Sequence, residues 1–357
     1  MTEQIFADAG DTSLPPTRDI ARWVATTALA SIDRVSLRWA RHCLLDWIAV
    51  TIAGSRDPLV DILVAEAVAD GATGVIPAVG RDETLPLSWA ILVNGSASHA
   101  LDYDDVNTAM HGHPTVAVLS AVLCAGAAGG RSLDDVLRAF VIGYEVCCLV
   151  GEMTGDGHYA KGWHATATIG TFGAAAGIAA LDGLDAERTA HALGSAATSA
   201  AGLKSMFGTM SKPMHAGRAA QSGWLSARLA ARGWLSRPDA LECAQGFWAT
   251  QARDPAPQPV GTHGNKPFQI RNNLFKYHAA CYMTHSSIEA CRDLRGKHGV
   301  DPARIATVRL RVSEGHLDIC DIPDPDTGLE IKFSLRHTAA MALTGVDTAA
   351  IDNYSEA

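Results

Sequence analysis

The chain has 357 residues, of which 48% are hydrophobic and 19% are charged, and its formal net charge is -9. This composition is typical of a folded protein with a large core, and it excludes a disordered chain. The acidic balance argues against a general nucleic-acid or membrane-surface binder, because neither partner would be attracted by the field of the whole protein.

The cysteines and the N-terminus bear on the compartment. The eight cysteines lie mostly in apolar segments, and no two have C-x-x-C spacing. They are typical of reduced core residues, not of a disulfide framework or a zinc site. Residues 1–16 are polar and acidic, without the basic and apolar regions of a secretory signal. The longest apolar run, Val116 to Gly130, is too short and too glycine-rich to cross a bilayer. We therefore expect a cytoplasmic protein.

Apolar residues recur at helical spacing along most of the first 230 residues. Ser31 and Asp33 are candidate N-caps of a helix that ends at Gly54, and Ser132 with Asp135 forms a capping-box-like start. The expected helices are two within Ile20 to Gly54, then Leu59 to Ala69, Leu87 to His99, Pro114 to Ala128, Leu133 to Gly151, Ile169 to Ala180, Ala186 to Ala201 and Ala216 to Arg232.

The character of the sequence changes between Arg253 and Lys266, where three prolines are followed by glycines. We place a domain boundary there, with a main domain at 1–260 and a second domain at 261–357. The second domain has a helical segment from Ser286 to Leu294, and apolar and polar residues then alternate from Ala306 to Val312, as in a half-buried strand. The predicted fold class is mainly α: an all-helical main domain followed by a smaller α+β domain.

Lys212 stands out in a run of small residues in helical register. Pro213 lacks an amide hydrogen and restricts the residue before it, so we expect Lys212 in extended or turn geometry just before a helix. A lysine at a helix start is well placed to meet an anion. Taken alone, a solvated loop lysine is the simpler interpretation.

A second polar segment contains Asp102, Asp104 and Asp105, followed by His113. Asp102 and His113 together are a plausible pair in which a carboxylate orients a histidine. For Asp104 or Asp105 taken singly, helix capping is the better interpretation. The D-x-D-D spacing is a weak metal signal, and we predict no metal site.

Two further polar segments complete the set. His164 lies at an expected helix start, where a buried, satisfied histidine is an equally good interpretation. Tyr159 could transfer a proton if a neighbouring cation lowered its pKa. Lys276, Cys281 and His285 follow the domain boundary, and a nucleophilic role for Cys281 is weakly supported because no oxyanion element is recognisable. This inventory suits a small polyanionic substrate whose carboxylates are clamped while a proton moves at an adjacent carbon.

Five segments in this order resemble the MmgE/PrpD family, which includes 2-methylcitrate dehydratase, cis-aconitate decarboxylase and iminodisuccinate epimerase. The resemblance covers essentially the whole chain. The segments are Leu101 to Asp105, Gly112 to Pro114, Gly162 to His164, Lys212 to His215 and Lys276 to His285. The resemblance implies an all-helical main domain, a smaller α+β lid, a site between them, a homodimer and chemistry without a cofactor.

The resemblance also implies the site residues. The predicted catalytic residues are Tyr159, Lys212, His113 and Asp102, and the predicted substrate-binding residues are His164, Lys276 and His285. The expected activity is that of a lyase of the dehydratase type on a small di- or tricarboxylate. An epimerase of the iminodisuccinate type is the second interpretation, and a catalytically silent carboxylate-binding protein is the third.

Two departures from the family pattern qualify these expectations. His337 stands where decarboxylase-like members carry a tyrosine after the Phe-Ser pair, which weakens a decarboxylase assignment. The sequence stops at Ala357, whereas family members continue through the rest of the lid. We therefore expect a lid that is truncated at its C-terminal side.

Overall fold

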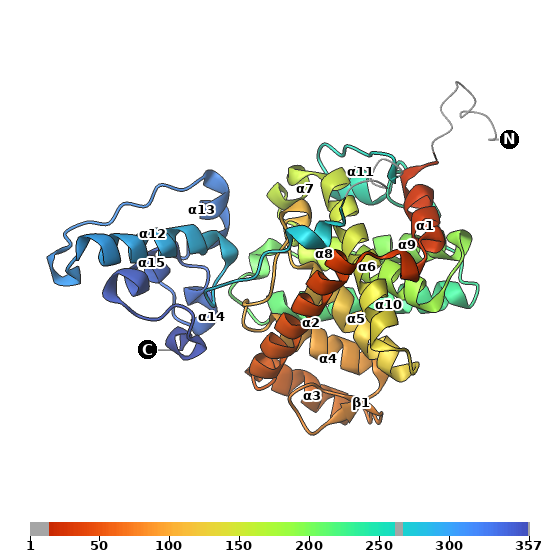
Figure 1. The fold of residues 1–357 in the computed structure, drawn as a ribbon, viewed down its shortest axis with the longest axis horizontal. Coiled ribbons are helices and arrows are strands. Elements are labelled where there is room, and N and C mark those ends of the chain that lie inside the picture. The colour runs from red at the N-terminus through yellow and green to blue at the C-terminus, as the bar shows by residue number, and fades with distance from the viewer. Residues whose placement is uncertain (1–13, 261–266, 356–357) are drawn as a thin grey trace.

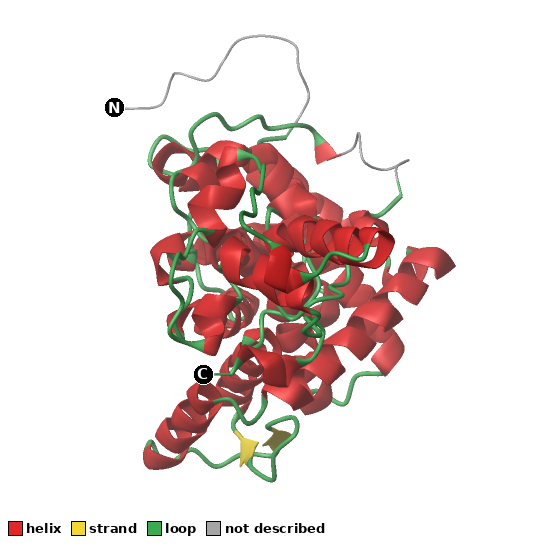
Figure 2. Ribbon diagram, turned by 90° about the vertical axis from the view of Figure 1, so that its left-hand side faces the viewer, coloured by secondary structure: helices red, strands yellow, loops and turns green. Residues whose placement is uncertain are grey.

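The computed structural model describes residues 14–260 and 267–355. The predicted domain boundary, between residues 260 and 261, adjoins residues 261–266 and so lies outside the described residues. Helices dominate both described ranges, as the sequence predicts (Figure 2). Among these helices, none is both long and apolar enough to cross a bilayer.

The helices form a larger group and a smaller group beside it (Figure 1). The larger group consists of α1 Pro16–Thr26, α2 Arg34–Gly54, α3 Pro58–Ala69, α4 Leu87–His99, α5 Pro114–Ala128, α6 Leu133–Thr154, α7 Asp156–Ala160, α8 Ala165–Asp182, α9 Ala186–Ser199, α10 Ser211–Ala231 and α11 Phe247–Gln251. The smaller group, which we call the lid, consists of α12 Tyr282–His298, α13 Glu314–Cys320, α14 Gly328–Ile331 and α15 Leu335–Thr344 with the segments between them.

The predicted helix starts rest on capping side chains that the structure confirms. The Asp33 carboxylate accepts the backbone N–H groups of Val35 and Ser36 at the start of α2. The Ser132 hydroxyl accepts the N–H of Asp135 at the start of α6. Each cap satisfies donors that the helix itself leaves free, so these starts are encoded within four residues of sequence.

Small residues let the helices of the main core approach closely. A Cβ atom added to Gly95 of α4 would lie 2.7 Å from the Cα of Gly217 in α10. A Cβ atom added to Gly223 of α10 would lie 2.6 Å from the carbonyl oxygen of Thr171 in α8. Neither distance leaves room for a side chain, so glycine sets the spacing of these helices. The close contact brings α10, which carries Lys212, next to α4 and the loop that follows it.

The predicted strand from Ala306 to Val312 is wrong for the described residues. The described part of the chain has one sheet, in which β1 Ile76–Pro77 pairs with β2 Thr84–Leu85 in the larger group (Figure 2). Residues 306–312 make no backbone hydrogen bond within the described ranges. Alternation puts the apolar side chains on one side, but a strand also needs a neighbouring strand. The predicted α+β lid is therefore a helical lid in the described residues.

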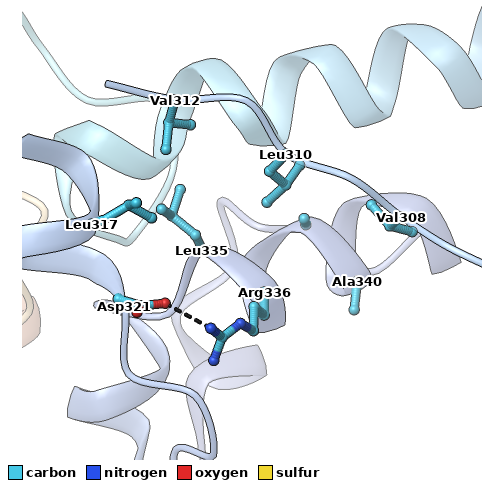
Figure 3. A pocket seen from close by; sticks show the side chains of 9 residues that line it. Val308, Leu310, Val312, Leu317, Asp321, Leu335, Arg336 and Ala340 are labelled. Carbon is cyan, nitrogen blue, oxygen red and sulfur yellow. Dashed lines mark ion pairs between the residues drawn. The ribbon is translucent and has the colours of Figure 1, made fainter. Parts of the chain in front are cut away.

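The apolar side of this segment faces a groove of about 450 Å³ on the lid. Val308, Leu310 and Val312 lie opposite Leu317 and Leu335 (Figure 3). At the edge of the groove, the guanidinium of Arg336 is 2.9 Å from the Asp321 carboxylate. The groove therefore holds one neutralised ion pair and otherwise apolar side chains, and it shares no residue with the charged cluster described next.

Candidate active site

Asp102 lies in a tight turn directly after α4. Its backbone N–H donates to the carbonyl of His99 at 3.2 Å, and its φ of 49° is left-handed. Few residues other than glycine adopt this conformation, although aspartate tolerates it better than most. The side chain is only 2% exposed. The turn therefore places a carboxylate in the interior, where it needs cationic partners.

Two buried lysines supply these partners. Lys212 of α10 is 4% exposed, and its Nζ donates to Asp102 Oδ1 at 2.6 Å. Lys276 is 7% exposed; its Nζ lies 3.2 Å from the same oxygen and donates to the Asp102 carbonyl at 2.5 Å. Burial alone would raise the pKa of Asp102, but the charges of Lys212 and Lys276 outweigh it and hold that pKa well below its usual range. The three residues therefore form an ionised cluster.

The backbone of Lys212 differs from the prediction. Helix α10 begins at Ser211, so Lys212 and Pro213 both lie in its first turn. Proline is tolerated there because the first N–H groups of a helix have no partner within the helix. The expected extended or turn geometry before the helix is therefore wrong, and the first turn of α10 directs the ammonium group to Asp102.

Asp104 holds two imidazoles beside this cluster. One of its oxygens lies 2.9 Å from His99 Nδ1, and the other lies 2.9 Å from the Nδ1 atoms of both His99 and His113. His113 Nδ1 also lies 2.9 Å from the carbonyl of Asp105, and its Nε2 lies 3.8 Å from Asp102 Oδ1. The capping interpretation of Asp104 is therefore wrong, because its carboxylate orients two histidines.

The orientation of these rings fixes their chemistry. When Nδ1 donates to a carboxylate, a neutral imidazole presents an unprotonated Nε2, which can accept a proton. Burial lowers the pKa of His99 to about 4, so that ring is neutral at physiological pH. Its Nε2 is buried without a hydrogen-bond partner among the described residues, and so is Asp102 Oδ2. Unpartnered buried polar atoms of this kind are rare in folded proteins.

His164 and His215 extend the cluster along α8 and α10. His164 is the N-cap of α8, and its Nδ1 lies 3.1 Å from His215 Nδ1. The ring of His164 stacks on that of His99 with centroids 5.9 Å apart. Burial and then the charge of Lys212 hold the pKa of His164 well below its usual range, and burial lowers that of His215 to about 4. The structure thus places His164 near Lys212 and His99, and its predicted role in substrate binding stays a prediction.

Tyr159 of α7 does not behave as the sequence suggested. The Nζ of Lys204 lies 4.2 Å from the centre of its ring, so a cation is nearby. Burial nevertheless raises the pKa of Tyr159 well above its usual value, and the neighbouring thiol of Cys281 raises it further. The phenol therefore stays protonated, and it can donate a proton rather than accept one. A cation is therefore present, but the condition stated for Tyr159, a pKa lowered by that cation, is not met.

His285 is not brought into the cluster. It makes no hydrogen bond or ion pair with Asp102 or the two lysines. Its ring packs against those of His278 and Tyr282, with centroids 4.8 and 5.2 Å away. It lines a separate cavity of about 640 Å³ that also includes Trp39. Of the predicted residues, the structure therefore groups Asp102, His113, His164, Lys212 and Lys276 and leaves His285 outside.

Sequence reasoning missed Lys332, which reaches the site from the lid. Its Nζ donates to the carbonyl of Leu101, the residue before Asp102. It is 3% exposed, and burial lowers its pKa to about 8. The sequence offered one signal for Lys332, which is that it lies between the apolar residues Ile331 and Phe333. A charged residue with apolar neighbours is buried more often than a lysine on a polar face.

His99, Asp102, Asp104 and His113 also have ligand atoms within 4.8 Å of one another, close enough to hold a metal ion. The charges around them oppose a dication, because the ammonium groups of Lys212 and Lys276 already neutralise Asp102. The absence of a metal site stays a prediction. The arrangement is better suited to an anion, which meets lysine ammonium groups and neutral imidazoles.

Comparisons with known proteins show the family of the chain. The MmgE/PrpD N-terminal domain matches residues 18–259, and the MmgE/PrpD C-terminal domain matches residues 278–357. The cis-aconitate decarboxylase-like protein oryM of Aspergillus oryzae is 30% identical over 82% of this chain and 64% of its own length. Cis-aconitate decarboxylase of Aspergillus terreus is 29% identical over 79% of this chain and 60% of its own, and that of Mus musculus is 28% identical over 73% and 56%. The chain thus spans about three fifths of the length of these curated relatives.

Proposed function

The chain belongs to the MmgE/PrpD family, as its sequence motifs indicate, and on that premise we propose that it is a lyase acting on a small di- or tricarboxylate. In this proposal a proton moves at a carbon next to a substrate carboxylate. The observation that carries it is the buried cluster of Lys212, Asp102 and Lys276 beside neutral imidazoles. No cofactor takes part.

Binding follows from the charges. Lys212 and Lys276 share one oxygen of Asp102, so each ammonium has further N–H donors to offer. A substrate carboxylate that accepts from them forms charge-assisted hydrogen bonds in a buried setting, where such bonds are strongest. His164, whose ring stacks on that of His99, contributes a neutral imidazole to the same site.

The proposed proton transfers need a base and an acid. His113 is the proposed base, because its Nδ1 side is fixed by Asp104 while its Nε2 faces the cluster. Tyr159 is the proposed acid, because its phenol carries a proton at neutral pH and lies near enough to the Asp102 carboxylate for that charge to raise its pKa. In a dehydration the acid protonates the departing hydroxyl group; in a decarboxylation it protonates the carbon that carbon dioxide leaves. One set of residues serves either reaction.

The names of the relatives favour a tricarboxylate. Three of them are cis-aconitate decarboxylases or a decarboxylase-like protein, so we place cis-aconitate first among substrates. His337 stands where decarboxylase-like members carry a tyrosine, which weakens the case for decarboxylation. Its backbone N–H donates to the Ser334 hydroxyl at 3.2 Å, so the residue lies at an ordinary helix start. Dehydration of 2-methylcitrate stays beside decarboxylation, and epimerisation of iminodisuccinate follows.

The test uses purified protein in deuterated water. It is incubated separately with cis-aconitate, 2-methylcitrate and iminodisuccinate, and product formation, release of carbon dioxide and deuterium incorporation at carbon are followed by NMR. We expect turnover of at least one of them, and its loss in Lys212→Ala. A protein that binds these acids but neither transforms them nor exchanges deuterium would be a silent carboxylate binder and would refute the proposal. A homodimer in the cytoplasm stays a prediction, which light scattering tests as far as the dimer is concerned.

A further inference from the structure

We propose that Lys332 is a positioning residue, which together with Lys276 holds two consecutive backbone carbonyls and thereby fixes the carboxylate of Asp102. The inference rests on the proposed function, because it adds a residue to the same site. Lys332 forms no hydrogen bond or ion pair with the Asp102 carboxylate or the imidazoles among the described residues; its Nζ donates to the turn that carries Asp102.

The geometry of the turn makes such a role necessary. Asp102 has a left-handed backbone with φ 49°, which is uncommon for a residue other than glycine and is held in place by its surroundings. The carbonyl before Asp102, that of Leu101, accepts from Lys332 Nζ. The carbonyl of Asp102 itself accepts from Lys276 Nζ at 2.5 Å. Two ammonium groups from the C-terminal part of the chain thus hold both carbonyls that flank the strained bond.

Lys332 is itself held firmly by the lid. It follows α14, whose start carries a capping box between Thr327 and Glu330. Its backbone carbonyl accepts the N–H of Cys281 at 3.0 Å, and its Nζ lies 5.2 Å from the centre of the Tyr354 ring. The position of the Lys332 ammonium group therefore depends on the lid and the residues that flank it, whereas the carbonyl to which it donates belongs to the loop after α4.

The burial of Lys332 needs a reason of this kind. A buried ammonium is costly unless it is paired, yet Lys332 forms no ion pair within the described residues. A methionine would fill the same space at lower cost. The charge of Lys332 instead forms a hydrogen bond across the boundary between the lid and the larger group. Its acceptor belongs to the turn that carries Asp102.

The experiment compares four variants with the wild type. Lys332→Met removes the donor and the charge, Lys332→Gln keeps an N–H donor without the charge, and Lys332→Arg keeps both. Lys161→Met is the matched control, because Lys161 also donates its Nζ to a backbone carbonyl, that of Ala252 at 3.0 Å, but on an exposed side chain outside the site. Circular dichroism and thermal unfolding establish which variants are folded.

Two readouts follow. Hydrogen–deuterium exchange of residues 99–106 should be faster in Lys332→Met than in the wild type and unchanged in Lys161→Met. With the substrate that the wild type turns over, kcat should fall by about 10- to 100-fold in Lys332→Met with little change in KM, because a misplaced group costs rate more than binding. Lys332→Arg should recover most of the rate, and Lys332→Gln should lie between.

The outcomes separate the two proposals. If the wild type transforms none of the tested acids, the proposed function fails, while the exchange of residues 99–106 still tests the role of Lys332. Unchanged exchange in folded Lys332→Met or Lys332→Gln would overturn the positioning role. So would a rise in KM with kcat unchanged, because that would make Lys332 a substrate contact.

Discussion

Replacing Asp102 by asparagine tests the ion cluster at its centre. At an effective dielectric of about 20, the attraction of Asp102 to Lys212 at 2.6 Å is about 6 kcal/mol and to Lys276 at 3.2 Å about 5 kcal/mol. Desolvation of the ions offsets most of that gain in the intact cluster. Asp102→Asn keeps the shape but leaves two buried ammonium groups without a counter-charge, and removing one partner of such a pair costs about 3–5 kcal/mol.

Urea denaturation, followed by circular dichroism at pH 7, measures the loss. The control is Asp134→Asn, which removes an exposed pair with Arg138 at 2.7 Å and should cost about 0.5 kcal/mol. The pKa of Asp102 is held below its usual value, so its contribution is present above about pH 4 and is lost as the pH falls further. The difference between wild type and Asp102→Asn should therefore shrink in acid. A cost no larger than that of Asp134→Asn would refute the buried cluster.

Three further predictions concern the same region. Burial lowers the pKa of Lys332 to about 8, so the unfolded chain holds more protons than the folded chain between about pH 8 and 10. At pH 7, Lys332→Met should therefore be more stable than the wild type by up to about 3 kcal/mol, reduced by the free energy of the hydrogen bond that it loses. This gain should vanish toward pH 10.5. A substoichiometric alkylating agent should label Cys281 before Cys243, which is also partly buried, because a hydrogen bond with the Cys320 thiol lowers the pKa of Cys281. Peptide mass spectrometry showing Cys243 labelled first would contradict this. Exhaustive chelation should leave turnover unchanged, and a loss that a divalent metal restores would instead assign the four-residue His and Asp group to a metal.

Local signals in the sequence were enough for the helices. The cap at Asp33 and the helical spacing after it depend on residues within one or two turns, and α2 forms where they predict. The strand from Ala306 to Val312 could not be judged in the same way, because pairing depends on a second segment that alternation does not reveal. Lys212 shows the limit of a local rule: Pro213 signals a helix start, but the rule does not fix the helix's first residue.

The site was predictable as a set of residues and less so as chemistry. Asp102, His113 and Lys212, which the sequence grouped through their motifs, lie close together in the fold, and their role as an active site stays a proposal. Lys332 was missed because its partner Leu101 is 231 positions away in the chain. The pKa of Tyr159 could be stated from the sequence only as a condition, because burial raises it and burial is a property of the fold.

The glycine contact between α4 and α10 has a consequence for how this protein tolerates sequence change. A Cβ atom at Gly217 would lie 2.2 Å from the carbonyl oxygen of Leu92, so even alanine forces the two helices apart. One of these helices carries Lys212, and the other leads into Asp102. In a saturation mutagenesis experiment selected for activity, Gly95 and Gly217 should therefore be as intolerant as the charged residues, although neither has a side chain to offer to a substrate. Mutational intolerance in this family would then map the mechanical frame of the site together with its chemistry.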